Sequence, residues 1–160
     1  VAACNDNNVV TRYLSTGTYE VKKSVETISN AMDVGNPSNF VRILEIMQNN
    51  FDQLKNALSS YSYDDISTQA AITRVYNDYG YTLDPHGAVA FLAAEEFIHD
   101  HEHAIILETA HPVKFPEVVE EAIGHPLTIP ASVQYLLDKP KQSIPLAATY
   151  TAFKQWMLRK

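Results

Sequence analysis

Three side chains that can do chemistry lie close together, because Thr109, His111 and Lys114 place a hydroxyl, an imidazole and an ammonium on one short stretch. They follow the apolar run 104–107, and such a run predicts a strand buried on both faces of a parallel sheet. In open α/β sheets, ligands collect just beyond the carboxyl ends of such strands. The pattern predicts a small-molecule site here, although a turn explains a lone Thr and a solvated surface explains a lone Lys.

The remaining candidates share a place just after an expected strand or just before an expected helix. Asp84-Pro85 is a helix-start signal, and residues 35–39 approach a helix N-terminus that could hold an anion. Simple capping explains the same residues, so we expect them to line a cleft rather than to catalyse. These candidates are Asn5, Asp6, Asn7, Ser38, Asn39, Asp84 and His86.

Residues 99–103 read His-Asp-His-Glu-His, which could bind a metal if the tract were extended. The tract lies between an expected helix end and an expected buried strand, where polar turn residues are usual. We therefore favour a solvated turn and expect no metal site. Cys4 is the only cysteine, which excludes an intrachain disulfide and a cysteine-based zinc site.

The composition indicates a globular chain that can bury one sizeable core, with 160 residues of which 46% are hydrophobic and 19% charged. The net charge of −7, with no basic run, argues against nucleic acid as a partner. No segment approaches the roughly 20 apolar residues that cross a bilayer, and the first residues lack the pattern of a signal peptide. We expect no membrane partner and a cytoplasmic location.

The hydrophobic pattern predicts alternating strands and helices. We expect a strand end at residues 1–4, a helix at 9–14, one long helix from 38 to 58 and a helix at 67–79. A strand at 81–83, a helix at 84–97, a strand at 104–108 and a helix at 116–123 follow. Strand, helix, strand, helix is the order of a parallel sheet, so the fold class is α/β, an open and mostly parallel sheet with flanking helices. Beyond residue 124, prolines predict a helical tail over 125–160, with helices near 130–138 and 147–159.

Four blocks carry a resemblance to a known family: NDNNVVTR at 5–12, AMDVGNPSNF at 31–40, DPHGAVA at 84–90 and TAHPVKFPE at 109–117. In this order they resemble the threonine synthases of the long, bacterial and fungal type. The resemblance implies a partial large domain of a fold type II, tryptophan synthase beta-like pyridoxal-phosphate enzyme. It also implies the conversion of O-phospho-L-homoserine and water to L-threonine and phosphate.

Carried over residue by residue, the resemblance implies that Thr109 binds the cofactor by meeting its pyridine nitrogen. A neutral hydroxyl there can donate to an unprotonated nitrogen, whereas an Asp would hold that nitrogen protonated and make the ring a stronger electron sink. The resemblance implies cleft lining by Asn5, Asp6, Asn7, Ser38, Asn39, Asp84, His86, His111 and Lys114. Gly87 and Asn8 depart from the family pattern, where Thr and Asp are more common.

Two segments of the family do not occur in this sequence: the one like Phe-Lys-Asp that carries the Schiff-base lysine, and the phosphate-binding one like Ser-Gly-Asn-Phe-Gly-Asp. We therefore expect residues 1–160 to be a C-terminal portion of the catalytic region that holds no catalytic residue and is inactive alone. The missing N-terminal part of the same chain would be its partner. The alternatives are a threonine-synthase-like paralogue with another substrate, and a non-enzymatic α/β module that binds metal or a partner.

Overall fold

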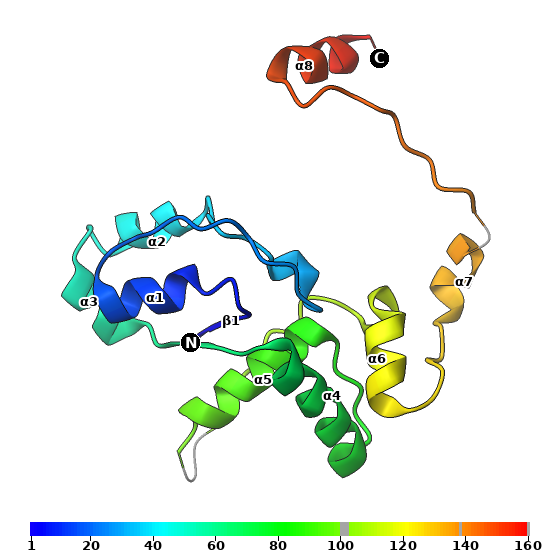
Figure 1. The fold of residues 1–160 in the computed structure, drawn as a ribbon, viewed down its shortest axis with the longest axis horizontal. Coiled ribbons are helices and arrows are strands. Elements are labelled where there is room, and N and C mark those ends of the chain that lie inside the picture. Colours follow the sequence, from blue (N-terminus) through cyan, green and yellow to red (C-terminus); the bar gives the residue numbers. More distant parts are fainter. Residues whose placement is uncertain (100–102, 138, 160) are drawn as a thin grey trace. The chain divides into compact units, whose positions relative to one another are not determined.

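The computed structural model describes residues 1–99, 103–137 and 139–159. The chain divides into two units, Val1–Thr128 and Ile129–Lys160 (Figure 1). All the candidate site residues lie in the first unit.

The first unit contains a small parallel sheet. Strand β1 (Ala2–Cys4) pairs with strand β2 (Ser60–Ser62), with Ala2 opposite Ser60 and Cys4 opposite Ser62. Parallel strands need a long crossover, and this one contains helix α1 (Val9–Thr16), the 3₁₀ turn η1 (Asn30–Met32), and helices α2 (Phe40–Ile46) and α3 (Phe51–Ala57). The strand at 1–4 is confirmed, whereas β2 was missed because Ser-Tyr-Ser carries no apolar run.

The crossover helices pack on one apolar cluster around Leu14, Phe40 and Leu54. Tyr13 lies edge-on to Phe40 and to Phe51, with ring centroids 5.4 Å apart in both pairs. Edge-to-face rings add to the free energy gained by burying apolar area. The cluster therefore holds α1, α2 and α3 together across a sequence separation of about forty residues.

The prediction of a single long helix over 38–58 is wrong, because α2 and α3 are separate. Gln48 and Asn49 lie between them with φ of 52° and 56°, in the left-handed region that ends a right-handed helix. The Asn50 side chain then caps α3 by accepting a hydrogen bond from the Gln53 N–H at 3.0 Å. The apolar residues of this segment, among them Phe40 and Leu54, do lie in a core, but their spacing does not reveal the break.

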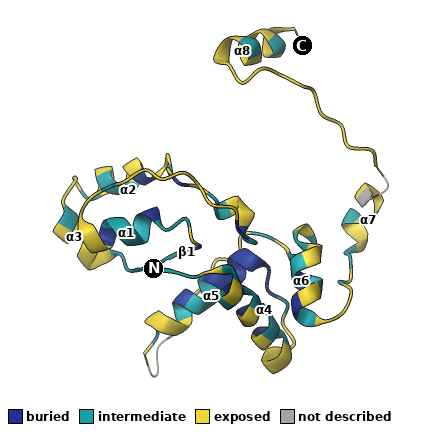
Figure 2. Ribbon diagram, viewed as in Figure 1, coloured by how far each residue is buried: buried dark blue, intermediate teal, exposed yellow. Residues whose placement is uncertain are grey.

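A second core lies between helices α4 (Asp65–Tyr79), α5 (Pro85–Phe97) and α6 (Pro116–Ile123). Its buried members include Ile72 on α4, Ala88 on α5 and Val119 on α6. Figure 2 shows the first turns of α5 as buried. The helix at 84–97 and the helix at 116–123 are confirmed. Helix α4 starts two residues earlier than expected, because Asp64 caps it by accepting from the Ser67 N–H at 2.8 Å.

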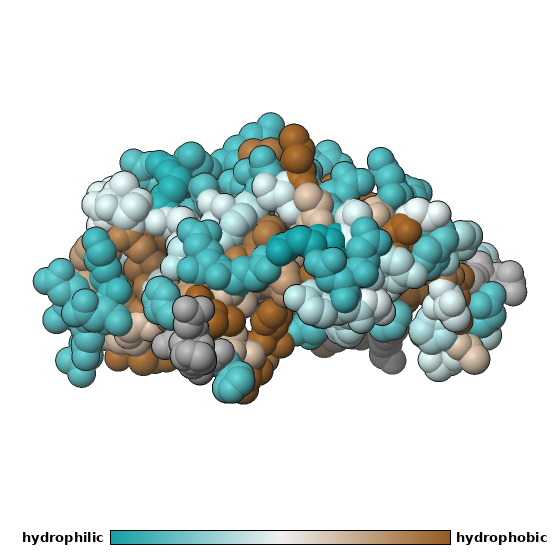
Figure 3. All heavy atoms as spheres, turned by 90° about the horizontal axis from the view of Figure 1, so that it is seen from below, coloured by the Kyte–Doolittle hydropathy of each residue, from teal (hydrophilic) through white to brown (hydrophobic). Residues whose placement is uncertain are grey.

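The predictions of strands at 81–83 and at 104–108 are wrong for this structure, which shows no regular secondary structure in either segment. A strand needs a hydrogen-bonded neighbour, and within the described residues only β1 and β2 pair. Ile105 and Leu107 are 92% and 77% exposed instead of buried on both faces. Figure 3 shows one face of the molecule, where hydrophobic side chains reach the surface between hydrophilic ones.

The second unit contains helices α7 (Ala131–Leu137) and α8 (Tyr150–Leu158), in the places expected for helices near 130–138 and 147–159. Thr149 caps α8 by accepting a hydrogen bond from the Ala152 N–H at 3.3 Å. Pro140 and Pro145 lie in the non-helical segment between the two helices, as their missing N–H requires. Among the helices that the structure describes, none is long and apolar enough to cross a membrane.

Candidate functional site

The N-terminus of α5 places two of the candidate residues in direct contact. The Asp84 carboxylate accepts a hydrogen bond from the His86 N–H at 2.8 Å, and its Oδ1 lies 2.7 Å from His86 Nδ1. Asp84 is fully buried and His86 is 7% exposed. The His86 ring packs on Phe115 at a centroid distance of 4.8 Å, and its Nε2 has no hydrogen-bond partner within the described part of the chain. The helix cap therefore also fixes the orientation of an imidazole.

Glu108, which immediately precedes Thr109, brings a second carboxyl to this helix end. Its carboxyl lies beside Asp84 and near the Tyr81 hydroxyl, although the residue as a whole is exposed. Partial desolvation of the carboxyl, followed by the interaction with the Asp84 carboxyl and its negative charge, raises the pKa of Glu108 to about 7. Burial alone would raise the pKa of Asp84, but the hydrogen bonds from His86 and Glu108 outweigh it and lower that pKa to about 2. Sequence reasoning missed Glu108; its signal is an acidic residue at the end of an apolar run.

The loop after Glu108 leaves three functional groups accessible. Thr109 is exposed, and its hydroxyl makes no hydrogen bond within the residues that the structure describes. His111 caps the 3₁₀ turn η2 (Pro112–Lys114), because its Nδ1 accepts from the Val113 N–H at 3.2 Å. Lys114 is exposed on that turn. The hydroxyl, the imidazole and the ammonium are therefore all exposed on one loop.

A cavity of about 380 Å³ joins this loop to the Glu108 side chain. Its lining includes Tyr81, Thr82, Glu108, His111 and His125. The His125 Nε2 lies 2.6 Å from the hydroxyl of Tyr76 on α4. The cavity therefore combines neutral donors, imidazoles and one carboxyl, a lining suited to a small polar ligand.

Asn5 and Asn7 lie elsewhere in the first unit, in a hydrogen-bond network just past the end of β1. The Asn5 side-chain NH₂ donates to Thr27 Oγ1 at 2.8 Å and to Asp33 Oδ1 at 2.9 Å. The Asn7 NH₂ donates to the same Asp33 oxygen at 3.0 Å. Asp6 is exposed beside them. The network ties the segment 25–33 to the strand end, and Thr27 and Asp33 were missed because that segment reads only as polar connecting structure.

Ser38 and Asn39 occupy a third place, at the start of α2. Both are exposed, and Asn39 stands at the N-cap of α2 without a side-chain capping hydrogen bond. Ser38 lines a small cavity of about 180 Å³ together with Tyr19 and Phe40. The structure therefore divides the candidates between the α5 terminus with its facing loop, the end of β1, and the start of α2.

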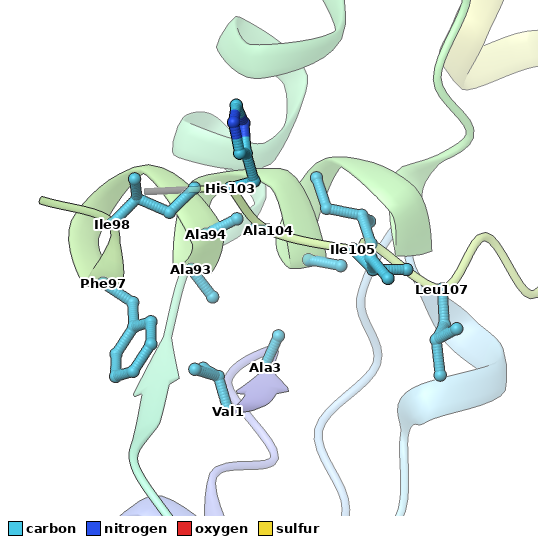
Figure 4. A pocket seen from close by; sticks show the side chains of 12 residues that line it. Val1, Ala3, Ala93, Ala94, Phe97, Ile98, His103, Ala104, Ile105 and Leu107 are labelled. Atoms are coloured by element: carbon cyan, nitrogen blue, oxygen red, sulfur yellow. The ribbon is translucent and has the colours of Figure 1, made fainter. Parts of the chain in front are cut away.

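A larger groove of about 780 Å³ is lined almost wholly by apolar side chains from β1, from α5 and from residues 103–107 (Figure 4). Val1 and Ala3 face Phe97 and Ala93 across it. His103, from the tract predicted as a solvated turn, lies at its rim, whereas residues 100–102 lie outside the described residues. Within the described part, no group of three or more His, Cys, Asp or Glu side chains is placed to hold a metal ion.

The chain is similar to threonine synthases. The family model described as "Threonine synthase, C-terminal" matches residues 87–157. The threonine synthase of Escherichia coli is 37% identical over 99% of this chain, and the chain covers 36% of that enzyme. Its crystal structure superposes on 99% of the chain with a TM-score of 0.88. The PLP-bound threonine synthase of Brucella melitensis superposes on 98% of the chain, and this chain covers 39% of it, with 26% identity and a TM-score of 0.80.

The fold is therefore α/β, of the kind found in fold type II pyridoxal-phosphate enzymes. Within that class the chain matches the C-terminal portion of threonine synthases. It spans about 36% of the length of the Escherichia coli relative. The resemblance seen in the four sequence blocks is confirmed.

Proposed function

We propose that this chain forms part of a pyridoxal-phosphate-dependent threonine synthase, which converts O-phospho-L-homoserine and water to L-threonine and phosphate. The observation that carries the proposal is Thr109, whose exposed hydroxyl is unengaged within the described chain and lies next to the anchored Glu108. The superposition on the PLP-bound enzyme of Brucella melitensis supports the same cofactor.

Thr109 suits the pyridine end of the cofactor. Its hydroxyl donates a hydrogen bond to an unprotonated ring nitrogen and brings no charge to it. When bound, the cofactor supplies the electron sink that stabilises negative charge on the substrate carbons. A hydroxyl partner moderates that sink, whereas a carboxylate partner would strengthen it.

His111 and Lys114 provide the positive charge and the protons that a phosphorylated amino acid requires. Both are exposed on the loop that starts at Thr109, and an ammonium or a protonated imidazole attracts a phosphate dianion. The buried pair of Asp84 and His86 orients the end of α5 beside that loop. Asn5, Asp6, Asn7, Ser38 and Asn39 form further cleft lining in this proposal.

The proposed partner is the N-terminal part of the same enzyme. Three observations support it: the chain spans about 36% of its relative, its sequence lacks a segment like Phe-Lys-Asp, and it carries the large apolar groove. Without the Schiff-base lysine no base is positioned at the substrate α-carbon, so the 160 residues alone are inactive. The intact enzyme works in the cytoplasm.

The test is phosphate release from O-phospho-L-homoserine with pyridoxal phosphate present. It compares this chain with the same reading frame extended to its natural start. Activity only in the extended protein supports the proposal. Activity in neither favours a paralogue with another substrate, and activity in the 160 residues alone refutes the role given to the absent lysine.

A further inference from the structure

The Glu108 carboxyl lies against Gly87 at the N-terminus of α5, in the place that a Cβ atom of residue 87 would occupy. A Cβ atom added at Gly87 would lie 2.1 Å from Glu108 Oε1 and 2.7 Å from Glu108 Cδ, both far inside van der Waals contact. The Glu108 carboxyl therefore sits where any side chain at position 87 would start. Because the carboxyl is the far end of a flexible side chain, a side chain at position 87 would displace it from this place.

The carboxyl is also held there by polar contacts. It lies beside the Asp84 carboxyl, close enough to share a proton with it, and near the Tyr81 hydroxyl. Two carboxyl groups form a hydrogen bond only when they share a proton. Asp84 is buried and already accepts from the His86 N–H, which assigns the charge to Asp84 and the proton to Glu108.

We propose that Glu108 is a positioning residue, which fastens the start of the Thr109 loop to the N-terminus of α5 through a proton shared with Asp84 in the room left by Gly87. The anchoring itself needs no cofactor, and its effect on catalysis rests on the proposed function. Loss of the shared proton places two carboxylates side by side, and their repulsion releases the loop. Besides Asp84 and its partner His86, the titratable groups that line the cavities beside Glu108 are Tyr79, Tyr81, His111 and His125.

The first test is a double-mutant cycle in urea unfolding of this chain, with Gly87→Ala, Glu108→Ala and the double variant. An alanine in a helix is otherwise favoured over glycine. We expect Gly87→Ala alone to raise the unfolding equilibrium constant about two- to tenfold, because the new methyl displaces the carboxyl from its place beside Asp84. In the Glu108→Ala background the same change should leave that constant unchanged or lower it.

The matched control is Glu121→Ala, which removes an exposed carboxyl from α6. The effects of Gly87→Ala and Glu121→Ala should add without coupling. Equal effects of Gly87→Ala with and without Glu108 would overturn the shared-space argument.

The second test needs no destabilised variant. Carboxyl ¹³C NMR follows the titration of Glu108 in the wild-type chain and in Asp84→Asn. We expect Glu108 to titrate near pH 7, well above the ordinary Glu pKa of about 4.3, and its midpoint to fall in Asp84→Asn. A midpoint at the ordinary Glu value, or one unmoved by Asp84→Asn, would overturn the proposal. Because neither test uses cofactor or substrate, an enzyme that lacks activity but keeps the coupling would refute the proposed function alone.

Discussion

The side-chain amide of Asn5 donates to Asp33 Oδ1 at 2.9 Å, which joins the end of β1 to a segment 28 residues further along the chain. Asn5 is 1% exposed, so truncation to alanine leaves Asp33 and Thr27 without this donor in a buried place. We expect Asn5→Ala to lower the free energy of unfolding by about 1–3 kcal/mol. Urea unfolding of the two chains measures the difference.

The neighbouring Asp6 offers the control for that change. Because Asp6 is exposed, Asp6→Ala should alter the free energy of unfolding by less than about 0.5 kcal/mol. Equal losses in the two variants would contradict a structural role for the Asn5 network.

Gly35 packs against the backbone of Lys22 and cannot accept a side chain. The Lys22 N–H donates to the Gly35 carbonyl at 3.0 Å, and a Cβ at Gly35 would lie 1.9 Å from the Lys22 carbonyl oxygen. Gly35→Ala should therefore lower the free energy of unfolding by about 3 kcal/mol or more, because the backbone rather than a flexible side chain must move. Thermal unfolding of wild type and variant provides the measurement.

Gly80→Ala is the comparison for Gly35→Ala, because a Cβ there meets nothing within 4 Å and suffers only from the left-handed φ of 64°. Gly80→Ala should lower the free energy of unfolding by only about 1–2 kcal/mol. A smaller loss for Gly35→Ala than for Gly80→Ala would show that the contact with Lys22 is not formed.

The carboxyl pair at α5 predicts opposite pH responses from its two members. The pKa of Asp84 is lowered to about 2, so its contribution to stability is present above the ordinary Asp pKa near 4 and is lost as the pH falls towards 2. The pKa of Glu108 is raised to about 7, so its contribution is complete below an ordinary Glu pKa and is lost as the pH rises through 7.

Substitution separates the two responses. Between about pH 5 and pH 8, the free energy of unfolding should fall less steeply with rising pH in Glu108→Gln than in the wild type. Below about pH 4, it should fall less with falling pH in Asp84→Asn than in the wild type. Urea unfolding at half-unit pH steps measures both slopes. Wild-type slopes that persist in the two variants would assign the pH dependence to other groups.

Removing the Thr109 hydroxyl should lower the activity of the intact enzyme. Thr109→Val keeps the shape but removes the hydroxyl, and we expect kcat/KM for O-phospho-L-homoserine to fall by about 10- to 100-fold, the equivalent of about 1–3 kcal/mol. Thr109→Ser should retain most activity, because the donor stays. Steady-state phosphate release measures all three proteins, and a fully active Thr109→Val would remove Thr109 from the cofactor site.

Much of the helical architecture could be predicted because it has local causes. Asp84-Pro85 starts α5, and Gly80 and Gly124 end α4 and α6 with φ of 64° and 77°. These signals lie within a few residues of the boundaries that they set, so tertiary context does not override them.

The sheet could not be predicted in the same way, because pairing depends on distant residues. Ser60–Ser62 forms a strand only through its register with Ala2–Cys4, and its own pattern is polar. The apolar run 104–107 shows the reverse case. Its pattern predicts a buried strand, but it forms none, because no described segment pairs with it. Strand assignment thus follows the partner rather than the propensity.

The site shows the same division between local and distant causes. The loop from Thr109 to Lys114 and the helix start at Asp84-Pro85 were predicted from the sequence, since each is local. The contact between Asp84 and His86 was not predicted. The contact of Glu108 with Gly87 joins two residues 21 positions apart and could be found only in three dimensions.

The central claim is that this chain does the work of the C-terminal part of a threonine synthase. Its most direct test replaces the matched C-terminal part of the Escherichia coli enzyme with these 160 residues and measures phosphate release from O-phospho-L-homoserine with pyridoxal phosphate. We predict an active chimera whose activity falls with Thr109→Val. A chimera that folds and binds pyridoxal phosphate but releases no phosphate would contradict the claim.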